Sequence, residues 1–328
     1  MGFTARFLFP LFCLLLAGNP GLRAAGGGEP GSAPAGTGDS GLIRFTDDAG
    51  NRVLVAPKPR RIVSLTMFTD EVLLELVGPE RLAAVSLFAA DPAVSNVSGR
   101  IEGIPRRLDL QPEVILSLQP DLVFVANWSD AAAVRQLRAA GLPVYLVATA
   151  FTVGQIREKI RRTALLVGEP AAGERLVSRL DRRLRDVEAR LAAVPAGRRL
   201  TVLDYSSWGA AMGRGTSWDE VVRRAGLRNA VGALRVDGWG QVPLSKEKLI
   251  ELDPDLLVLP GWVYGEQGGA DAFYRRVTAD PALRGLKAVR NRRVLRMPEN
   301  LRAATSQYIV EAIEFLARAA YPELWGNP

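Results

Sequence analysis

The side chains that could bind or transform a ligand are unevenly supplied in this sequence. Of its 328 residues none is His, one is Cys and six are Trp. Without His there can be no Ser-His-Asp or Cys-His nucleophilic site, no imidazole base and no His-ligated zinc, copper or haem. A single Cys also excludes a Cys-cluster metal site and an internal disulfide. The composition therefore favours binding by aromatic and charged side chains.

Aromatic residues and one Arg follow predicted strands or lie in a Gly-flanked loop, and open α/β sheets bind ligands beyond the carboxyl ends of their strands. Rigid rings bury large areas at low entropic cost and stack on conjugated ligands, so several together favour a bulky, partly planar ligand. Packing of each ring under its own loop is the alternative. The candidate ligand-binding residues are Phe68, Phe88, Trp128, Tyr205, Trp208, Trp239, Trp262 and Arg302.

Acidic side chains that could serve catalysis are Asp204, Glu266 and Glu299, but no motif supports a reaction. The sequence has no G-x-x-x-x-G-K-[ST] phosphate loop, no G-x-S-x-G elbow and no G-x-G-x-x-G after a strand. We expect no enzymatic activity. An exported α/β enzyme is the alternative, and a scaffold or interaction protein is a third.

The formal net charge is +7, with 42 Lys and Arg against 35 Asp and Glu. Most of the basic residues are Arg, interleaved with acids along helical stretches, whereas nucleic-acid binders concentrate their charge in a stripe or tail. We therefore expect solvated helix faces and no nucleic-acid partner.

The elements that must position these residues alternate between strand and helix, which predicts right-handed βαβ units and largely parallel sheets. At roughly 150 residues per domain, the chain should hold about two domains. The predicted strands are 61–65, 82–87, 122–126, 143–147, 200–204, 256–259 and 293–296.

A long helix is predicted over 169–195, between an N-terminal α/β lobe at 42–168 and a C-terminal α/β lobe at 196–328. At 1.5 Å per residue it would run about 36 Å, long enough to bridge two lobes. An ordinary surface helix is the alternative. Its apolar stripe, spaced 4, 4, 3, 4 and 3, is formed by Leu176, Leu180, Leu184, Val187, Leu191 and Val194.

The two halves contain a repeat. Residues 110–122 align without gaps to residues 244–256, with six of the 13 positions identical. Each copy predicts a two-turn helix, a Pro-Asp turn and a buried strand, with Glu113 and Glu247 at equivalent positions in the first turn. A weaker echo pairs Asp70-Glu-Val72 with Asp219-Glu-Val221.

The N-terminus predicts export. Arg6 precedes an apolar run of 12 residues at 7–18, which is too short to span a membrane but suits a signal peptide. We expect a signal peptide at 1–25 and a flexible Gly/Pro/Ser linker at 26–41. Cys13 lies within the apolar run without small residues before it, so we do not expect a lipoprotein.

Four segments carry a resemblance to a known family: Phe45-Thr-Asp-Asp-Ala-Gly50, Pro59-Arg-Arg-Ile-Val-Ser-Leu65, Asp70-Glu-Val-Leu-Leu74 and Leu118-Gln-Pro-Asp-Leu-Val123. They look like segments of the periplasmic substrate-binding proteins of ABC importers, in the class that serves cobalamin, ferric siderophores and haem. The likeness covers about residues 43–322. The resemblance implies an α/β fold of two Rossmann-like lobes with largely parallel sheets, joined by one long interlobe helix. It also implies a ligand held between the lobes, limited closure and no catalysis.

The resemblance also implies residue roles. Trp128 and Tyr205 lie close to ligand-contacting positions of the cobalamin binders, Arg302 lies near a cleft Arg, and Trp239 matches after a two-residue shift. Glu113 and Glu247 match the Glu of each lobe that pairs with Arg on the membrane permease. Stabilisation of the helix dipole is the alternative role for these two carboxylates.

The expected cargo is a bulky preformed metal chelate, either cobalamin (or another corrinoid) or a ferric siderophore, with no cofactor of the protein itself. Haem or another metal complex is the alternative, although residues 85–91 lack the Tyr typical of haem binders. Arg106 and Arg107 either meet an anionic siderophore or are solvated. The expected partner is an ABC permease dimer in the inner membrane, and the protein is expected to be a periplasmic monomer.

Overall fold

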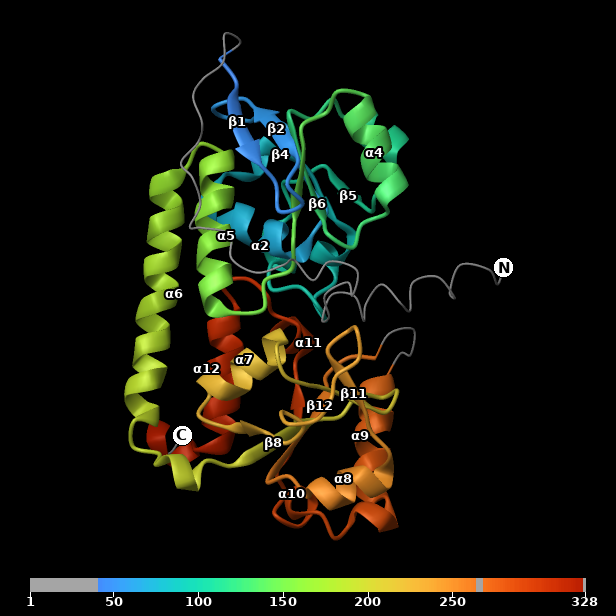
Figure 1. Ribbon diagram of the computed structural model, residues 1–328, viewed down its shortest axis with the longest axis vertical. Helices are drawn as coiled ribbons and strands as arrows, with labels where there is room; N and C mark the ends of the chain where they lie inside the picture. The colour runs from blue at the N-terminus through green and yellow to red at the C-terminus, as the bar shows by residue number, and fades with distance from the viewer. Residues whose placement is uncertain (1–40, 264–267, 327–328) are drawn as a thin grey trace, which may run out of the picture. The chain divides into compact units, whose positions relative to one another are not determined.

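The computed structural model describes residues 41–263 and 268–326, which divide into two compact units. The N-terminal unit contains residues 41–150 and 154–178, and the C-terminal unit contains the other described residues. Figure 1 follows the chain by colour from one unit to the other. The predicted signal peptide and all but the last residue of the predicted linker lie outside the described residues.

The N-terminal unit is built on a five-stranded parallel sheet with the strand order β5-β4-β3-β6-β7. All five residues of β6 are buried, as expected for a strand covered on both faces. The strands are β3 (Ile62–Ser64), β4 (Leu82–Ser86), β5 (Arg106–Leu108), β6 (Leu122–Ala126) and β7 (Val144–Val147). The helices are α2 (Met67–Leu76), α3 (Pro112–Ser117), α4 (Ala131–Ala139) and α5 (Val153–Leu166).

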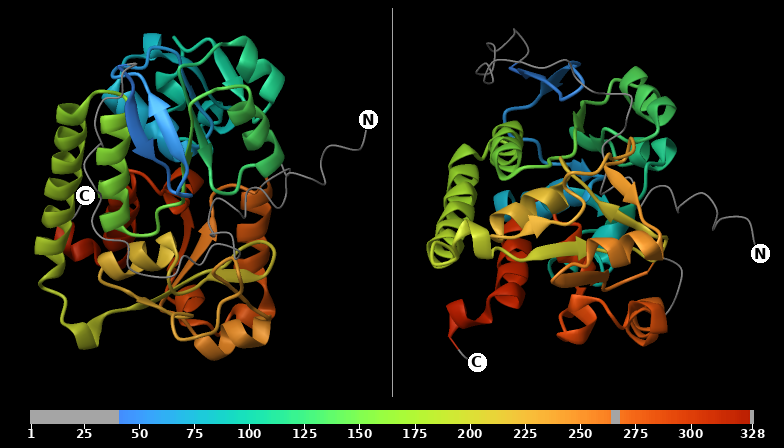
Figure 2. Two further views of the ribbon diagram at one scale, coloured as in Figure 1. Left: turned by 45° about the horizontal axis from the view of Figure 1, so that its top comes forward. Right: turned by 60° about the horizontal axis from the view of Figure 1, so that its bottom comes forward.

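An antiparallel hairpin precedes this sheet and is drawn as the two blue arrows in Figure 2. It consists of β1 (Ile43–Thr46) and β2 (Arg52–Val55). The Asp47 carboxylate closes the turn by accepting hydrogen bonds from Ala49 N at 3.0 Å and Asn51 N at 2.8 Å. The segment Phe45–Gly50, which carries part of the family resemblance, thus contains the end of a strand and a turn that the Asp47 side chain stabilises by hydrogen bonding.

The C-terminal unit has a parallel sheet of order β10-β8-β12-β13 and a separate antiparallel pair, β9 with β11. Helices α7 and α12 lie side by side (Figure 1). The strands are β8 (Thr201–Asp204), β9 (Ala210–Met212), β10 (Arg228–Asn229), β11 (Gln241–Pro243), β12 (Leu256–Pro260) and β13 (Val294–Met297). The helices are α7 (Ser217–Arg224), α8 (Lys246–Leu252), α9 (Gly269–Ala279), α10 (Lys287–Arg290), α11 (Glu299–Arg302) and α12 (Ile309–Ala320).

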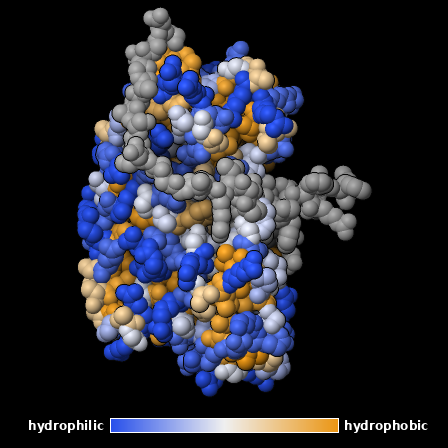
Figure 3. All heavy atoms as spheres, in the orientation of Figure 1, coloured by the Kyte–Doolittle hydropathy of each residue, from blue (hydrophilic) through white to orange (hydrophobic). Residues whose placement is uncertain are grey.

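Helix α6 (Pro170–Leu191) is the long helix expected from the sequence, and the division between the units falls within it, after residue 178. It ends four residues before the predicted end at 195, because Pro195 disfavours helical geometry at the residue before it. Its apolar stripe from Leu176 to Leu191 is buried. Hydrophilic residues are spread over its outer face (Figure 3). Within the described ranges, none of the helices combines the length and apolarity needed to cross a bilayer.

The repeat predicted from the sequence recurs in the structure as the joint α3–β6 in one unit and α8–β12 in the other. Gln119 (φ 47°) and Asp253 (φ 39°) occupy equivalent left-handed positions. Two residues later, the Asp121 carboxylate accepts from Arg60 N at 2.6 Å and Arg61 N at 2.9 Å, while Asp255 Oδ2 accepts from Thr201 N at 2.8 Å. The repeated Asp therefore ties the start of one strand to the start of its parallel neighbour.

All seven strands predicted from apolar runs are present, which confirms the two-unit α/β fold with parallel sheets. The hairpin β1–β2 and the short strands β5, β9, β10 and β11 were not predicted. Strands β5 and β10 lack an apolar run, since they read Arg-Arg-Leu and Arg-Asn. Strands β2 and β9 do contain apolar residues, Val-Leu-Val and Ala-Ala-Met, but these runs are only three residues long. Their pairing with a neighbour defines them, and pairing is not visible in local sequence.

Candidate ligand-binding site

The predicted aromatic residues of the N-terminal unit lie where strands of the parallel sheet end. Phe68 follows β3 and is buried as the second residue of α2, whereas Trp128 follows β6 and is half-buried. Phe88 is half-buried in the 3-10 turn Leu87–Ala90 that follows β4. Its neighbour Leu87, which the sequence did not single out, is 51% exposed. The carboxyl edge of this sheet therefore presents a set of apolar side chains.

In the C-terminal unit the predicted residues also follow strand ends. Tyr205 and Trp208 follow β8, Trp262 follows β12, and Arg302 lies in α11 after β13. Tyr205, Trp262 and Trp239 are half-buried, the last in the loop before β11. The ring of Tyr205 packs against Phe273 with 5.9 Å between centroids and joins the core of this unit.

Trp208 lies in a tight turn that ends at Gly209 (φ +80°), whose backbone N–H donates to Ser206 O at 3.1 Å. The hydroxyl of Ser206 accepts from Ala210 N at 2.9 Å, which fixes the base of the turn. The indole Nε1 donates to Gln241 Oε1 at 3.1 Å. Trp208 is nevertheless 37% exposed. It is an aromatic surface held in one orientation, which limits the entropy lost on binding.

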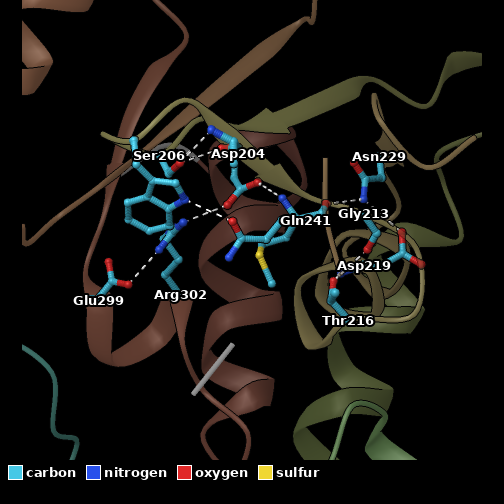
Figure 4. Close-up of polar contacts among 12 residues, drawn as sticks. Asp204, Ser206, Gly213, Thr216, Asp219, Asn229, Gln241, Glu299 and Arg302 are labelled. Carbon is cyan, nitrogen blue, oxygen red and sulfur yellow. Dashed lines mark hydrogen bonds and ion pairs between the residues drawn. The ribbon is translucent and has the colours of Figure 1, made fainter. Parts of the chain in front are cut away.

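Arg302 lies in a buried ionic cluster rather than at the surface (Figure 4). Its Nη2 donates to Asp204 Oδ2 at 2.9 Å, and its Nη1 donates to Glu299 Oε1 at 2.7 Å. Asp204 Oδ1 also accepts from Met212 N at 2.8 Å. The guanidinium thus joins helix α11 to the end of β8, and Asp204 links it to the end of β9. Strands β8 and β9 flank the turn that contains Trp208.

The cluster contains two carboxylates and one guanidinium, so it carries an excess negative charge when all three groups are ionised. Burial raises the pKa of Glu299, although Arg302 opposes the shift. Burial alone would lower the pKa of Arg302, but the two carboxylates outweigh it and raise that pKa. Within the described part of the chain, Glu299 Oε2 and Arg302 Nε have no hydrogen-bond partner. Such a cluster costs desolvation energy and serves to fix geometry.

A family profile described as "Periplasmic binding protein" matches residues 62–301, well over half of the chain. The chain belongs to the periplasmic binding protein family.

Relatives of this periplasmic binding protein include YvrC of Bacillus subtilis (strain 168), described as an uncharacterized ABC transporter substrate-binding lipoprotein. The two are 24% identical over 284 residues, or 84% of this chain and 85% of YvrC. A cobalamin-binding protein of Halobacterium salinarum is 27% identical over 217 residues, or 65% of this chain and 57% of the relative. The apo structure of the heme-binding protein RhuT from Roseiflexus sp. RS-1 has a TM-score of 0.68 and 25% identity, covering 81% of this chain and 99% of RhuT.

These matches confirm the family resemblance and the two-lobed α/β fold class. They also show that this is a substrate-binding protein and not an enzyme. Asp204 and Glu299, two of the acids considered for catalysis, form ion pairs with Arg302. Glu266 lies outside the described residues. None of the predicted ligand contacts is tested by these similarities, so each stays a prediction.

The two Glu residues proposed to dock a permease are both exposed in the first turn of a helix, Glu113 in α3 and Glu247 in α8. Glu113 Oε1 accepts from Gln136 Nε2 at 3.2 Å. The side chain of Ser245 lowers the pKa of the Glu247 carboxyl by hydrogen bonding. Both carboxylates are therefore available to a partner in solution, as their proposed role requires.

Several residues of the site escaped the sequence analysis. Gln241 has no signal in the sequence, because its partner Trp208 is 33 residues away. The position of Leu87, at the end of an apolar strand run, could have marked it as a candidate. Asp204 and Glu299 were considered only as possible catalytic acids. The pairing of Asp204 with Arg302 joins residues that are 98 positions apart, so the local sequence gives no sign of it.

Proposed function

We propose that this periplasmic binding protein is the solute-binding component of an ABC importer and captures a bulky, partly planar metal chelate, cobalamin (or another corrinoid) or a ferric siderophore. The observation that carries the proposal is Trp208, an indole that is 37% exposed yet fixed by a turn and by Gln241 at the carboxyl end of β8. Exposed, oriented aromatic rings suit the conjugated face of a corrin or a catecholate. The cobalamin-binding relative from Halobacterium supports the corrinoid.

The chelate brings its own metal in this proposal. The chain contains no His, and within the residues that the structure describes no group of three or more Asp, Glu or Cys is arranged to hold a metal ion. Haem is a second candidate cargo, since the heme-binding protein RhuT shares the fold over 81% of this chain. Haem would bind without a His ligand to its iron, so another side chain such as Tyr, or stacking and charge, would have to hold it.

Delivery requires a partner in the inner membrane. We infer that Glu113 and Glu247 each pair with Arg on an ABC permease dimer, after export of the monomeric protein to the periplasm through its signal peptide. The exposure of both carboxylates supports this role. Charge reversal of both, Glu113→Lys with Glu247→Lys, should abolish transport and leave ligand affinity intact. Normal uptake by the double variant would disprove docking through these residues.

The cargo is tested by titrating the purified protein with cyanocobalamin, dicyanocobinamide, ferric catecholate and hydroxamate siderophores, and haemin, followed by Trp fluorescence and calorimetry. We expect sub-micromolar binding to one class only, about the range of a specific small-ligand site. Trp208→Ala should weaken that binding about tenfold or more and remove part of the quenching. The matched control is Trp325→Phe, because Trp325 lies in a C-terminal 3-10 turn beneath Arg190 and Arg318. Absence of binding to every cargo would overturn the proposal.

A further inference from the structure

A pocket lies in the N-terminal unit, at the edge of the sheet opposite the aromatic residues. Strands of a parallel sheet all start at one edge and end at the other. The pocket is lined by Leu82 and Arg106, the first residues of β4 and β5, and by Arg60 and Arg61, which immediately precede β3. Leu87 and Trp128 follow the opposite ends of their strands. The pocket is therefore separate from the candidate cargo site.

The pocket has a volume of about 270 Å³, and its lining combines apolar side chains with a charged set of residues, here called the rim. Leu82 and Leu118 belong to the apolar part, and three guanidiniums and one carboxylate, that of Glu80, belong to the polar part. When all four groups are ionised, the rim carries an excess of positive charge. A small anion would be attracted to it.

The three Arg side chains differ in their engagement. Arg61 Nε donates to Leu118 O at 3.0 Å, which anchors its guanidinium at the rim. Within the described part of the chain, the guanidiniums of Arg60 and Arg106 form no ion pair or hydrogen bond, and both residues are exposed. Their neighbours Arg81 and Arg107 are committed elsewhere: Arg81 pairs with Glu169 at 2.9 Å, and Arg107 donates to Ile104 O at 2.6 Å. Two of the three guanidiniums that line the pocket, those of Arg60 and Arg106, are thus not engaged by other groups of the described chain.

We propose that this pocket binds a phosphate group, an anion whose tetrahedral oxygens can accept paired hydrogen bonds from the several guanidiniums that line it. Arg is the residue that suits this geometry, since its planar fork donates two parallel hydrogen bonds to phosphate. The Glu80 carboxylate can accept from a hydroxyl of a phosphate ester. Free phosphate esters and lipid head groups share this chemistry. The site also gives Arg106 a role other than contact with the cargo.

The first arm of the test uses soluble ligands. Inorganic phosphate and glycerol 3-phosphate are titrated into the purified protein at low ionic strength by calorimetry. We expect saturable binding to one site, weakened about tenfold or more in the double variant Arg60→Ala with Arg106→Ala. The matched control is Arg135→Ala, an exposed Arg on α4 outside the pocket, which should leave binding unchanged. Glu80→Gln should strengthen the binding of inorganic phosphate, because it removes a like charge from the rim.

The second arm identifies the source of the phosphate. Sedimentation with phosphatidylglycerol vesicles, absent with phosphatidylcholine vesicles and lost in the double variant, would show that a lipid head group is the ligand. Saturable phosphate binding without sedimentation would indicate a soluble ester. No saturable binding of either soluble ligand, or equal binding by the double variant and Arg135→Ala, would overturn the proposal. Cargo binding through Trp208 is measured separately, so the two proposals fail independently.

Discussion

The two units place a buried carboxylate at the same position of equivalent helices and give it opposite surroundings. Helices α2 and α7 each follow a Thr N-cap, Thr66 and Thr216, whose side chain accepts from the backbone N–H three residues later. The fourth residue of each helix is acidic and buried: Asp70 is 0% exposed and Glu220 is 5% exposed. The comparison isolates the effect of the neighbours on the charge of a buried acid.

Asp70 is surrounded by hydroxyl groups, whereas Glu220 is surrounded by guanidiniums. Ser86 donates its hydroxyl and its backbone N–H to the Asp70 carboxylate, at 2.5 and 3.3 Å, and burial raises the pKa of Asp70 to about 7. Burial would also raise the pKa of Glu220, but hydrogen bonds from Arg223, Val153 N and Arg224 outweigh it, and the pKa is lowered. Arg223 and Arg224 lie three and four residues after Glu220, where Asp70 is followed by leucines. One helical turn of sequence therefore decides whether the acid is charged.

The largest expected effect is on the pH dependence of stability in Asp70→Asn. In the folded protein the pKa of Asp70 is raised from 3.8 to about 7, so the unfolded chain releases this proton first and stability falls as pH rises through that window. Asn does not titrate. The stability of the variant relative to the wild type should therefore rise by about 3 kcal/mol between about pH 4 and about pH 8.

Urea unfolding across this range measures the difference, with the exposed substitution Asp109→Asn as the matched control in the same unit. A stability difference between Asp70→Asn and the wild type that does not change with pH would contradict the raised pKa of Asp70. It would also remove the contrast with Glu220.

Removing the guanidiniums should make Glu220 behave as Asp70 does. In the double variant Arg223→Gln with Arg224→Gln, the buried carboxylate loses its cationic partners and its pKa should rise instead of falling. We expect a loss of about 2 kcal/mol in the free energy of unfolding at neutral pH, and a smaller loss in acid, where Glu220 is protonated.

Chemical denaturation at two pH values tests this change. The charge-preserving variant Arg223→Lys with Arg224→Lys is the control, and Glu220→Gln added to the double Gln variant should restore most of the loss at neutral pH. Equal losses in acid and at neutral pH would show that the arginines act through packing and not through the charge of Glu220.

The framework of each unit could be predicted because apolar runs report burial directly. Strand β12 reads Leu-Leu-Val-Leu-Pro and is buried throughout. The equivalence of Asp70 and Glu220 could not be predicted in this way. The sequence echo pairs Asp70 with Asp219, whereas the N-caps pair it with Glu220, because the number of residues between cap and acid is visible only once the helix start is known.

The aromatic residues of the candidate site could be selected from the sequence, whereas the polar contacts that orient them could not. Trp208 was chosen as a candidate because core packing does not usually place a Trp in a loop that follows a strand. Its partner Gln241 and the burial of Arg302 depend on contacts between loops distant in sequence, which no local periodicity encodes. Local pattern thus located the edge of the sheet, while the hydrogen bonds that orient the side chains required the fold.

The smallest expected effect concerns a feature that the two units share, the Asp of the repeated Pro-Asp joint. Asp121→Ala and Asp255→Ala each remove a carboxylate that accepts from backbone at the start of the neighbouring strand, Arg61 N in one unit and Thr201 N in the other. Each should cost about 1 kcal/mol, because both acids are half-buried and water can replace part of the interaction. The two costs should be similar, and they should add within about 0.5 kcal/mol in the double variant because the residues share no partner.

Urea unfolding of the single and double variants measures these costs. The milder matched pair is Asp121→Asn and Asp255→Asn, which keep one acceptor oxygen. A large cost at one position and none at the other would show that the repeated Pro-Asp joint is structural in only one unit.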